Sequence, residues 1–153
     1  MVKKAIWAMG LAVIVSGLVC LTPRRGLAGP VVLTDVKVIH ASSDPGPADP
    51  RLKDLVAELN SVFKYTSYRL VQSSSMSLAM NTTGTVPLPG ERTLNVTPAS
   101  VQNGRIQFRI DIFKGGTKIF GTLALLRDNS SLTIGGPEFE KGFLLFTISG
   151  RVR

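Results

Sequence analysis

The sequence predicts an α+β fold, an antiparallel β-sheet or sandwich of about seven to nine strands with one packed amphipathic helix. One segment places its apolar residues at three- and four-residue steps, as a helix does, and many short segments alternate with the period of two that is typical of strands. Turn residues such as Gly, Asn, Asp and Pro separate these segments. The order of strand, helix and then successive hairpins argues against a doubly wound parallel sheet.

The first strand is predicted over residues 31–41. Val36, Val38 and His40 share one of its faces, which indicates a half-buried strand. The turn-forming residues 42–47 end it, because Ser, Asp, Pro and Gly favour turns.

The clearest helix of the sequence follows this turn. Asp49 is a good N-cap, since its carboxylate accepts from the free amides of the first turn. Pro50 falls at the first helical position, where its missing N–H is not needed. The helix of about 14 residues should pack through one apolar stripe. This stripe consists of Leu52, Leu55, Val56, Leu59, Val62 and Phe63.

The rest of the chain predicts strands joined by tight turns. Asn103-Gly104 is the strongest hairpin signal, because both residues tolerate a positive φ. Ser73 to Ser75 is expected to interrupt the sheet, and Gly135-Gly136-Pro137 to start a loop. The expected strands are 65–72, 76–80, 85–88, 92–97, 105–113, 118–126 (with Ile119, Leu123 and Leu125 on one side), 132–134 and 143–149.

Residues 1–28 have the pattern of a secretory signal peptide. Lys3 and Lys4 precede an apolar run over residues 5–21, and small residues end the segment at Ala28. We expect cleavage there, which leaves residues 29–153 as a single β-rich domain that is periplasmic or extracellular.

A retained membrane anchor is the alternative interpretation of residues 5–21. The run is close to the lower limit of about 17 residues for a membrane-spanning helix, and Arg24 and Arg25 would suit its flank. Cys20 is the only cysteine, and Val19 before it argues against a lipid-modified cysteine. Residues 29–153 therefore contain no cysteine for a disulfide or a thiolate metal site.

The charge of the chain is basic but unevenly distributed. Four of its 18 basic residues lie within residues 1–28, and the remaining 14 face 10 acidic residues, so that residues 29–153 carry a net charge of +4. Such an excess favours either ordinary solubility or contact with an anionic surface such as lipopolysaccharide or phospholipid headgroups. We expect no nucleic-acid partner, and membrane contact only through the N-terminal segment if it is uncleaved.

The sequence contains no recognisable catalytic motif, and it predicts no cofactor and no metal site. His40 is the only histidine, and its phase with Val36 predicts a buried ring bonded to a backbone carbonyl. One histidine without cysteine does not complete a zinc site. The spacing of Asp44, Asp49 and Asp54 does not match a calcium loop.

Two acidic residues offer the one enzymatic alternative. Glu138 and Glu140 flank a phenylalanine after the Gly-Gly-Pro segment. In an extended loop both carboxylates would face one way, which suits acid–base chemistry on a sugar. Acidic residues near turns are more commonly solvated surface.

Tyr65, Tyr68 and Arg69 form the predicted partner-binding patch. They cluster at the junction between the helix and the next strand, and Tyr and Arg are frequent interface anchors. Core packing of the aromatic rings is the alternative. The last strand, residues 143–149, begins with apolar residues on both faces, which indicates either a central strand or pairing with another chain.

Two stretches together resemble a group of small exported bacterial proteins of unknown function. They are Asp49-Pro50-Arg51-Leu52 through Tyr65-Thr66-Ser67-Tyr68-Arg69-Leu70, and Gly135-Gly136-Pro137 through the strand at residues 143–149. The resemblance covers most of residues 29–153. It implies export and brings no catalytic residues.

The function expected from the sequence is that of a non-enzymatic envelope protein, a binding or assembly module with an envelope protein as its partner. Contact is expected through an exposed strand edge by β-augmentation and through the Tyr65, Tyr68 and Arg69 patch. The alternatives are a hydrolase using His40, Glu138 or Glu140, and a carrier of a small apolar ligand between helix and sheet.

Overall fold

The computed structural model describes residues 29–153. The signal peptide and the alternative anchor predicted within residues 1–28 lie outside the described residues. The described chain contains eight strands, one short 3₁₀ turn and one α-helix. They are β1 (Val31–Ser42), the turn Pro50–Leu52, α1 (Lys53–Val62), β2 (Ser67–Ala79), β3 (Gly84–Leu88), β4 (Arg92–Gln102), β5 (Arg105–Lys114), β6 (Thr117–Arg127), β7 (Ser130–Phe139) and β8 (Gly142–Val152).

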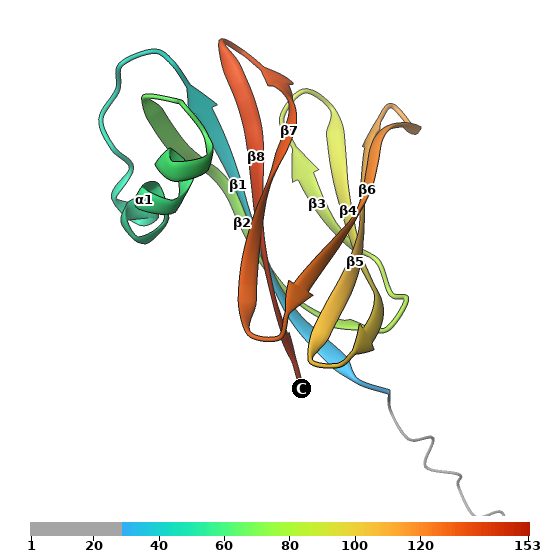
Figure 1. The fold of residues 1–153 in the computed structure, drawn as a ribbon. Coiled ribbons are helices and arrows are strands. Elements are labelled where there is room, and N and C mark those ends of the chain that lie inside the picture. The colour runs from blue at the N-terminus through green and yellow to red at the C-terminus, as the bar shows by residue number, and fades with distance from the viewer. Residues whose placement is uncertain (1–28) are drawn as a thin grey trace, which may run out of the picture.

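The strands form two four-stranded antiparallel sheets that face each other (Figure 1). The first sheet has the order β2-β1-β8-β7 and the second has the order β3-β4-β5-β6. The chain starts in the first sheet, builds the whole second sheet and returns for β7 and β8. This arrangement confirms the prediction of a mostly antiparallel β structure with one short helix and is consistent with a β-sandwich.

The main hydrophobic core lies between the two sheets. Alternate residues of each strand point into it, as the period of two requires. Val36 and Val38 of β1, Phe146 of β8 and Phe108 of β5 are fully buried there. Gly150 lets β8 approach the second sheet closely, because an added Cβ would lie 2.9 Å from a methyl group of Ile106.

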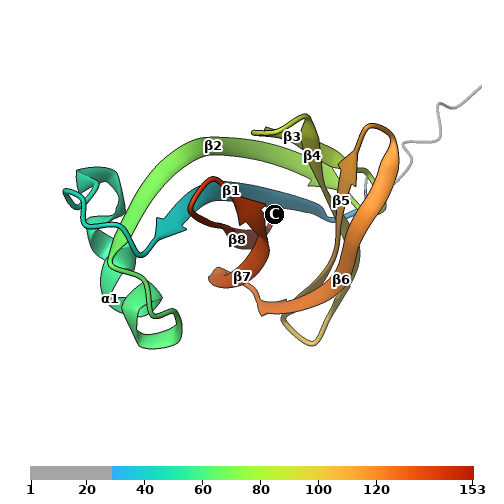
Figure 2. The ribbon, with the colours of Figure 1, turned by 90° about the horizontal axis from the view of Figure 1, so that it is seen from above.

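A second core forms where α1 covers one end of the outer face of the first sheet. Figure 2 shows the helix at this end, away from β5 and β6. Leu52 and Leu59 of the helical segment pack there on the sheet residues Ile39 and Leu145. Residues of both cores lie between Val32 and Val152, so residues 29–153 carry a complete hydrophobic interior.

The predicted apolar stripe of the helix is only partly buried. The α-helix proper has 10 residues and is shorter than expected, because residues 50–52 form a 3₁₀ turn and Phe63 already has extended backbone angles. Val62, the last residue of the helix, is 67% exposed. Asp49 caps the preceding 3₁₀ turn, with Pro50 at its first position, as predicted.

Two predicted interruptions of the sheet are wrong. Ser73 to Ser75 continue β2, because they pair with β1 and the side chains of Ser73 and Ser75 point to solvent. The Gly135-Gly136-Pro137 segment lies within β7 as a bulge against β8. Glycine is required at position 136 of this bulge, since a Cβ there would overlap the ring of Phe146. The predicted hairpin at Asn103-Gly104 is confirmed, with φ values of 52° and 68°.

Candidate functional site

The free edge of β2 is closed at one point by two side chains. β2 is the outermost strand of the first sheet and pairs only with β1 within residues 29–153. At Leu70 the backbone N–H donates to the carboxylate of Asp49 at 2.9 Å, and the carbonyl accepts from the guanidinium of Arg51 at 3.1 Å. The two side chains thus take the place of a neighbouring strand at this residue.

The Asp49–Arg51 pair has the geometry of a strong charge-assisted contact. Its closest N–O distance is 2.7 Å, and Asp49 also accepts from the backbone N–H of Arg51 at 3.0 Å. These hydrogen bonds, first from the Arg51 side chain and then from Leu70, hold the pKa of the Asp49 carboxyl well below its ordinary value. The same contact raises the pKa of Arg51. The pair therefore stays ionised while it covers the strand edge.

Beyond Leu70 the edge of β2 is uncovered over residues 72–77. This stretch has the sequence Gln-Ser-Ser-Ser-Met-Ser, which contains neither a charge nor a proline. Natural proteins commonly use both to block an exposed strand edge. The edge strands β3 and β7 each contain a proline, Pro87 and Pro137. We call residues 72–77 the open β2 edge.

The outer face of the first sheet beyond the helix is covered with hydroxyl groups. One row runs across all four strands through Ser75, Asp35, Ser149 and Ser131, which are direct cross-strand neighbours. A second row contains Ser73, Lys37, Thr147 and Thr133 in the same order. We call these two rows the hydroxyl face.

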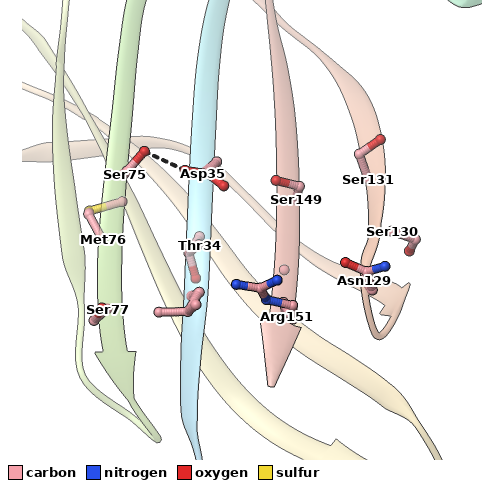
Figure 3. Close-up of a pocket in the computed structure, with 12 residues that line it drawn as sticks. Thr34, Asp35, Ser75, Met76, Ser77, Asn129, Ser130, Ser131, Ser149 and Arg151 are labelled. Atoms are coloured by element: carbon pink, nitrogen blue, oxygen red, sulfur yellow. Dashed lines mark hydrogen bonds between the residues drawn. The ribbon is translucent and has the colours of Figure 1, made fainter. Parts of the chain in front are cut away.

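A hollow of about 590 Å³ is lined by the first row of the hydroxyl face and by neighbouring residues that include Ser77, Asn129 and Arg151 (Figure 3). Ser75 donates to the carboxylate of Asp35 near one end of the hollow, and Arg151 and Asn129 lie towards the opposite end. The hydroxyls of Thr133 and Thr147 are 2.8 Å apart in the adjoining row. Hydroxyl, carboxylate, amide and guanidinium groups together offer both donors and acceptors to a polar partner.

The structure places the three residues of the predicted partner-binding patch in different environments. Tyr68 is only 4% exposed, and its hydroxyl donates to the carbonyl of Phe63 at 3.0 Å. It belongs to the second core, so the folded domain does not offer this ring to a partner. Tyr65 is half-buried against Tyr68 and Phe143. Arg69 is exposed and lies 3.9 Å from a carboxylate oxygen of Glu140.

His40 is buried and its Nε2 lies 3.2 Å from the carbonyl oxygen of Phe139, which confirms the position predicted for it. His40 and Glu140 line one hollow of about 780 Å³ beside the Asp49–Arg51 pair. Glu138 is exposed and is not among the residues of this hollow. The structure therefore brings together two of the three residues of the hydrolase alternative, with the histidine already engaged by a backbone group.

Neither a metal centre nor a membrane-crossing helix is found among residues 29–153. No group of three or more His, Cys, Asp and Glu side chains gathers in this range to hold an ion. None of its helices has the length and apolar character that a membrane span needs.

Sequence reasoning missed both surfaces of the first sheet that are best placed for binding. The alternation of Ser73, Ser75 and Ser77 was a signal for a hydroxyl face of a strand, because residues two apart share a face. The contact of Asp49 and Arg51 with Leu70 joins residues about twenty positions apart in the chain, so no local sequence pattern predicts it.

Comparison with known proteins gives no relative. No family model, no curated protein and no solved structure matches the chain.

Proposed function

We propose that the chain is an exported, non-enzymatic binding module of the cell envelope that captures an extended segment of a partner protein along the open β2 edge. The observation that carries this proposal is the pair of hydrogen bonds at Leu70. At Leu70 the backbone N–H donates to Asp49 and the carbonyl accepts from Arg51, so this point of the edge already bonds to groups outside the sheet. On the same edge, residues 72–77 have no such hydrogen-bond partner among the described residues. Beyond the bulge at Val71, an added strand would make backbone hydrogen bonds of the same kind with residues 72–77.

The hydroxyl face would contribute specificity to such a complex. Side chains of an added strand alternate between the two faces of a sheet. Those on the outer side would lie beside Ser73 and Ser75, whose neighbours on the other side are Lys37 and Asp35 of β1. This environment favours polar side chains that both donate and accept hydrogen bonds.

Export is supported by the sequence of residues 1–28, with its two lysines, apolar run and small residues before Gly29. Intact-mass measurement of the protein from its own cells tests this part separately. A mass that corresponds to residues 29–153 supports a cleaved signal peptide. A mass of the whole chain in the membrane fraction supports the anchor at residues 5–21 instead.

The carrier and hydrolase alternatives have less support. The interface between helix and sheet, where an apolar ligand would lie, is filled by Leu52, Leu59, Ile39 and Leu145, all almost fully buried. The hydrolase alternative rests on His40 and Glu140 at one hollow.

A displayed library of random peptides provides the direct test of strand capture. Consecutive N–H groups of a strand point alternately to its partner strand and to its free edge. Of the variants Ser74→Pro and Ser75→Pro, one therefore removes an N–H of the open β2 edge and the other an N–H bonded to β1. The variant that keeps the wild-type circular dichroism and melting temperature is the edge-blocked form.

Peptides selected on residues 29–153 should bind the edge-blocked form about tenfold more weakly, the value of one lost backbone hydrogen bond. They should also slow amide exchange in residues 72–77. Peptides that bind both forms equally, or a library that yields no binder, would contradict strand capture. Val62→Ser, a change at an exposed helix residue, is the matched control and should leave binding unchanged.

A further inference from the structure

The outer face of the second sheet carries two exposed leucines between arginines. Leu123 and Leu125 of β6 are 61% and 57% exposed, whereas Ala124 and Leu126 point into the main core. The strand neighbour of Leu123 is Arg109, and that of Leu125 is Gln107.

Arg105 of β5 and Arg127 of β6 are also cross-strand neighbours, and this pair extends the same surface. All six residues have odd numbers and share the solvent side of the two strands. We call this set the Arg-Leu patch: Arg105, Gln107, Arg109, Leu123, Leu125 and Arg127.

The charges of the Arg-Leu patch are not neutralised by the protein. None of the ion pairs formed within residues 29–153 includes Arg105, Arg109 or Arg127. The nearest acid on the same face is Asp111, and Lys118 already lies 2.5 Å from its carboxylate. The patch therefore combines a charge of +3 with exposed apolar surface.

A hollow of about 510 Å³ adjoins the patch on the β4 side. Arg105, Gln107 and Leu125 form one side of it, and Ser100 and Asn103 form the other. The Ser100 hydroxyl donates to the side-chain oxygen of Gln107, and the amide and guanidinium N–H groups of the hollow can donate to phosphate oxygens.

The patch reaches the end of the molecule where residues 1–28 join the domain. Val31 accepts a hydrogen bond from the backbone of Arg153, Val152 donates to Asp128, and Asp128 donates to Gly104. Figure 1 shows the start of β1 and the C-terminus at this same end. Arg105 and Arg127 are the immediate chain neighbours of Gly104 and Asp128.

We infer that the Arg-Leu patch docks residues 29–153 on the headgroups of an anionic phospholipid bilayer. Arginine binds phosphate through a planar fork of donors, and basic residues near an anionic membrane gain attraction at each position. The leucines would enter the boundary between headgroups and acyl chains, while the arginines keep their charged ends among the phosphates. The two exposed leucines beside the three arginines favour a membrane over an acidic protein, because a bilayer offers phosphates and an apolar boundary side by side.

Sedimentation with vesicles tests this inference on residues 29–153, which contain both hydrophobic cores. The probes are vesicles of phosphatidylcholine and vesicles of equal parts phosphatidylcholine and phosphatidylglycerol. We expect binding to the anionic vesicles only, and weaker binding as salt rises. The triple variant R105Q/R109Q/R127Q should lose about 100-fold in affinity. Leu123→Ser with Leu125→Ser should lose about tenfold while the charge is unchanged.

The matched control removes three charges at the other end of the molecule. K53Q/K64Q/K141Q changes exposed lysines at or near α1 and at the β7–β8 turn, and should bind like the wild type. If both triple variants lose the same amount of vesicle affinity, binding depends on net charge alone, and the assignment of binding to the Arg-Leu patch is overturned. No binding to anionic vesicles, or binding to polyglutamate in their place, would overturn the lipid assignment. Circular dichroism of each variant verifies that it is folded.

Discussion

Asp49 accepts a hydrogen bond from the backbone N–H of Leu70 at 2.9 Å, so the residue that caps the helical segment also covers the edge of the first sheet. Arg51 completes the contact by donating to the carbonyl of Leu70 and to Asp49. The helix and the strand edge are therefore fixed to each other through one ion pair.

Substitution of Asp49 by Asn should destabilise the domain in a pH-dependent manner. Asn keeps the shape and the capping ability of Asp but removes the charge. The pKa of Asp49 is lowered in the folded state from about 3.9 in the unfolded chain, so the ionised form contributes stability above that pH. The contribution shrinks as the pH falls through about 4 towards the lower folded pKa. Urea unfolding at neutral and at strongly acidic pH measures it.

We expect wild type to exceed Asp49→Asn in stability at pH 7 and the difference to narrow as the pH falls from about 4. A difference that stays constant down to the lowest pH at which both forms are folded would show that charge is not its origin. Glu58→Gln, which changes an exposed acid in the middle of the same helix and away from its first turn, is the control and should show little difference at any pH.

Tyr68 should behave as a core residue in unfolding experiments. Tyr68→Phe removes the hydroxyl bonded to Phe63 and should cost about 0.5–1.5 kcal/mol. Tyr68→Ala also leaves a cavity under the helix and should cost about 3–5 kcal/mol. Arg69→Ala, at the exposed neighbour, should change the free energy of unfolding by less than about 0.5 kcal/mol. A Tyr68→Ala variant as stable as wild type would contradict the placement of this ring.

Two adjacent glycines in β7 should differ sharply in their tolerance of a methyl group. At Gly136 an added Cβ would overlap the Phe146 ring and lie 2.8 Å from the carbonyl oxygen of Leu144. At Gly135 the nearest atom is a ring carbon of Phe63 at 4.0 Å. We expect Gly136→Ala to cost about 1–3 kcal/mol or more through overpacking and Gly135→Ala to cost much less. Equal thermal stability of the two variants would show that the bulge is built differently.

Thr133 and Thr147 should be energetically coupled across β7 and β8. Their hydroxyls are 2.8 Å apart, and Thr147 is buried beside the end of the second core. Replacing either residue by Val leaves the remaining hydroxyl without this hydrogen-bond partner, whereas replacing both residues leaves no hydroxyl unpaired. A double-mutant cycle should give a coupling of about 0.5–1 kcal/mol. Additive effects of the two substitutions would mean that the hydroxyls do not bond to each other.

The sequence predicted the parts of this fold that local chemistry determines. Asn103 and Gly104 were recognisable as a hairpin because they accept positive φ values, and Asp49 and Pro50 as a helix start because their side chains suit the first turn. The continuation of β2 through Ser73 to Ser75 was missed, although alternating serines are compatible with one face of a strand. Serine favours turns locally, and pairing with the central strand β1 overrides that preference.

The candidate site was less predictable because it is assembled by distant residues. The row from Ser75 to Ser131 exists only because β1 and β8 lie between β2 and β7, an order that no local pattern reveals. Tyr68 was expected at the surface because aromatic residues near arginine are common at interfaces. Its ring is buried because the short helix returns over that end of the first sheet.

Residue-resolved amide hydrogen exchange of free residues 29–153 tests the central claim most directly, because it reports which backbone groups of β2 are open. The account predicts slow exchange at Leu70, whose N–H is held by Asp49, and alternating fast and slow exchange over residues 72–77 as successive amides face solvent and β1. In Asp49→Asn the amide of Leu70 should exchange faster. Uniformly slow exchange over residues 72–77 would show that this edge is already covered and would contradict the proposal of strand capture.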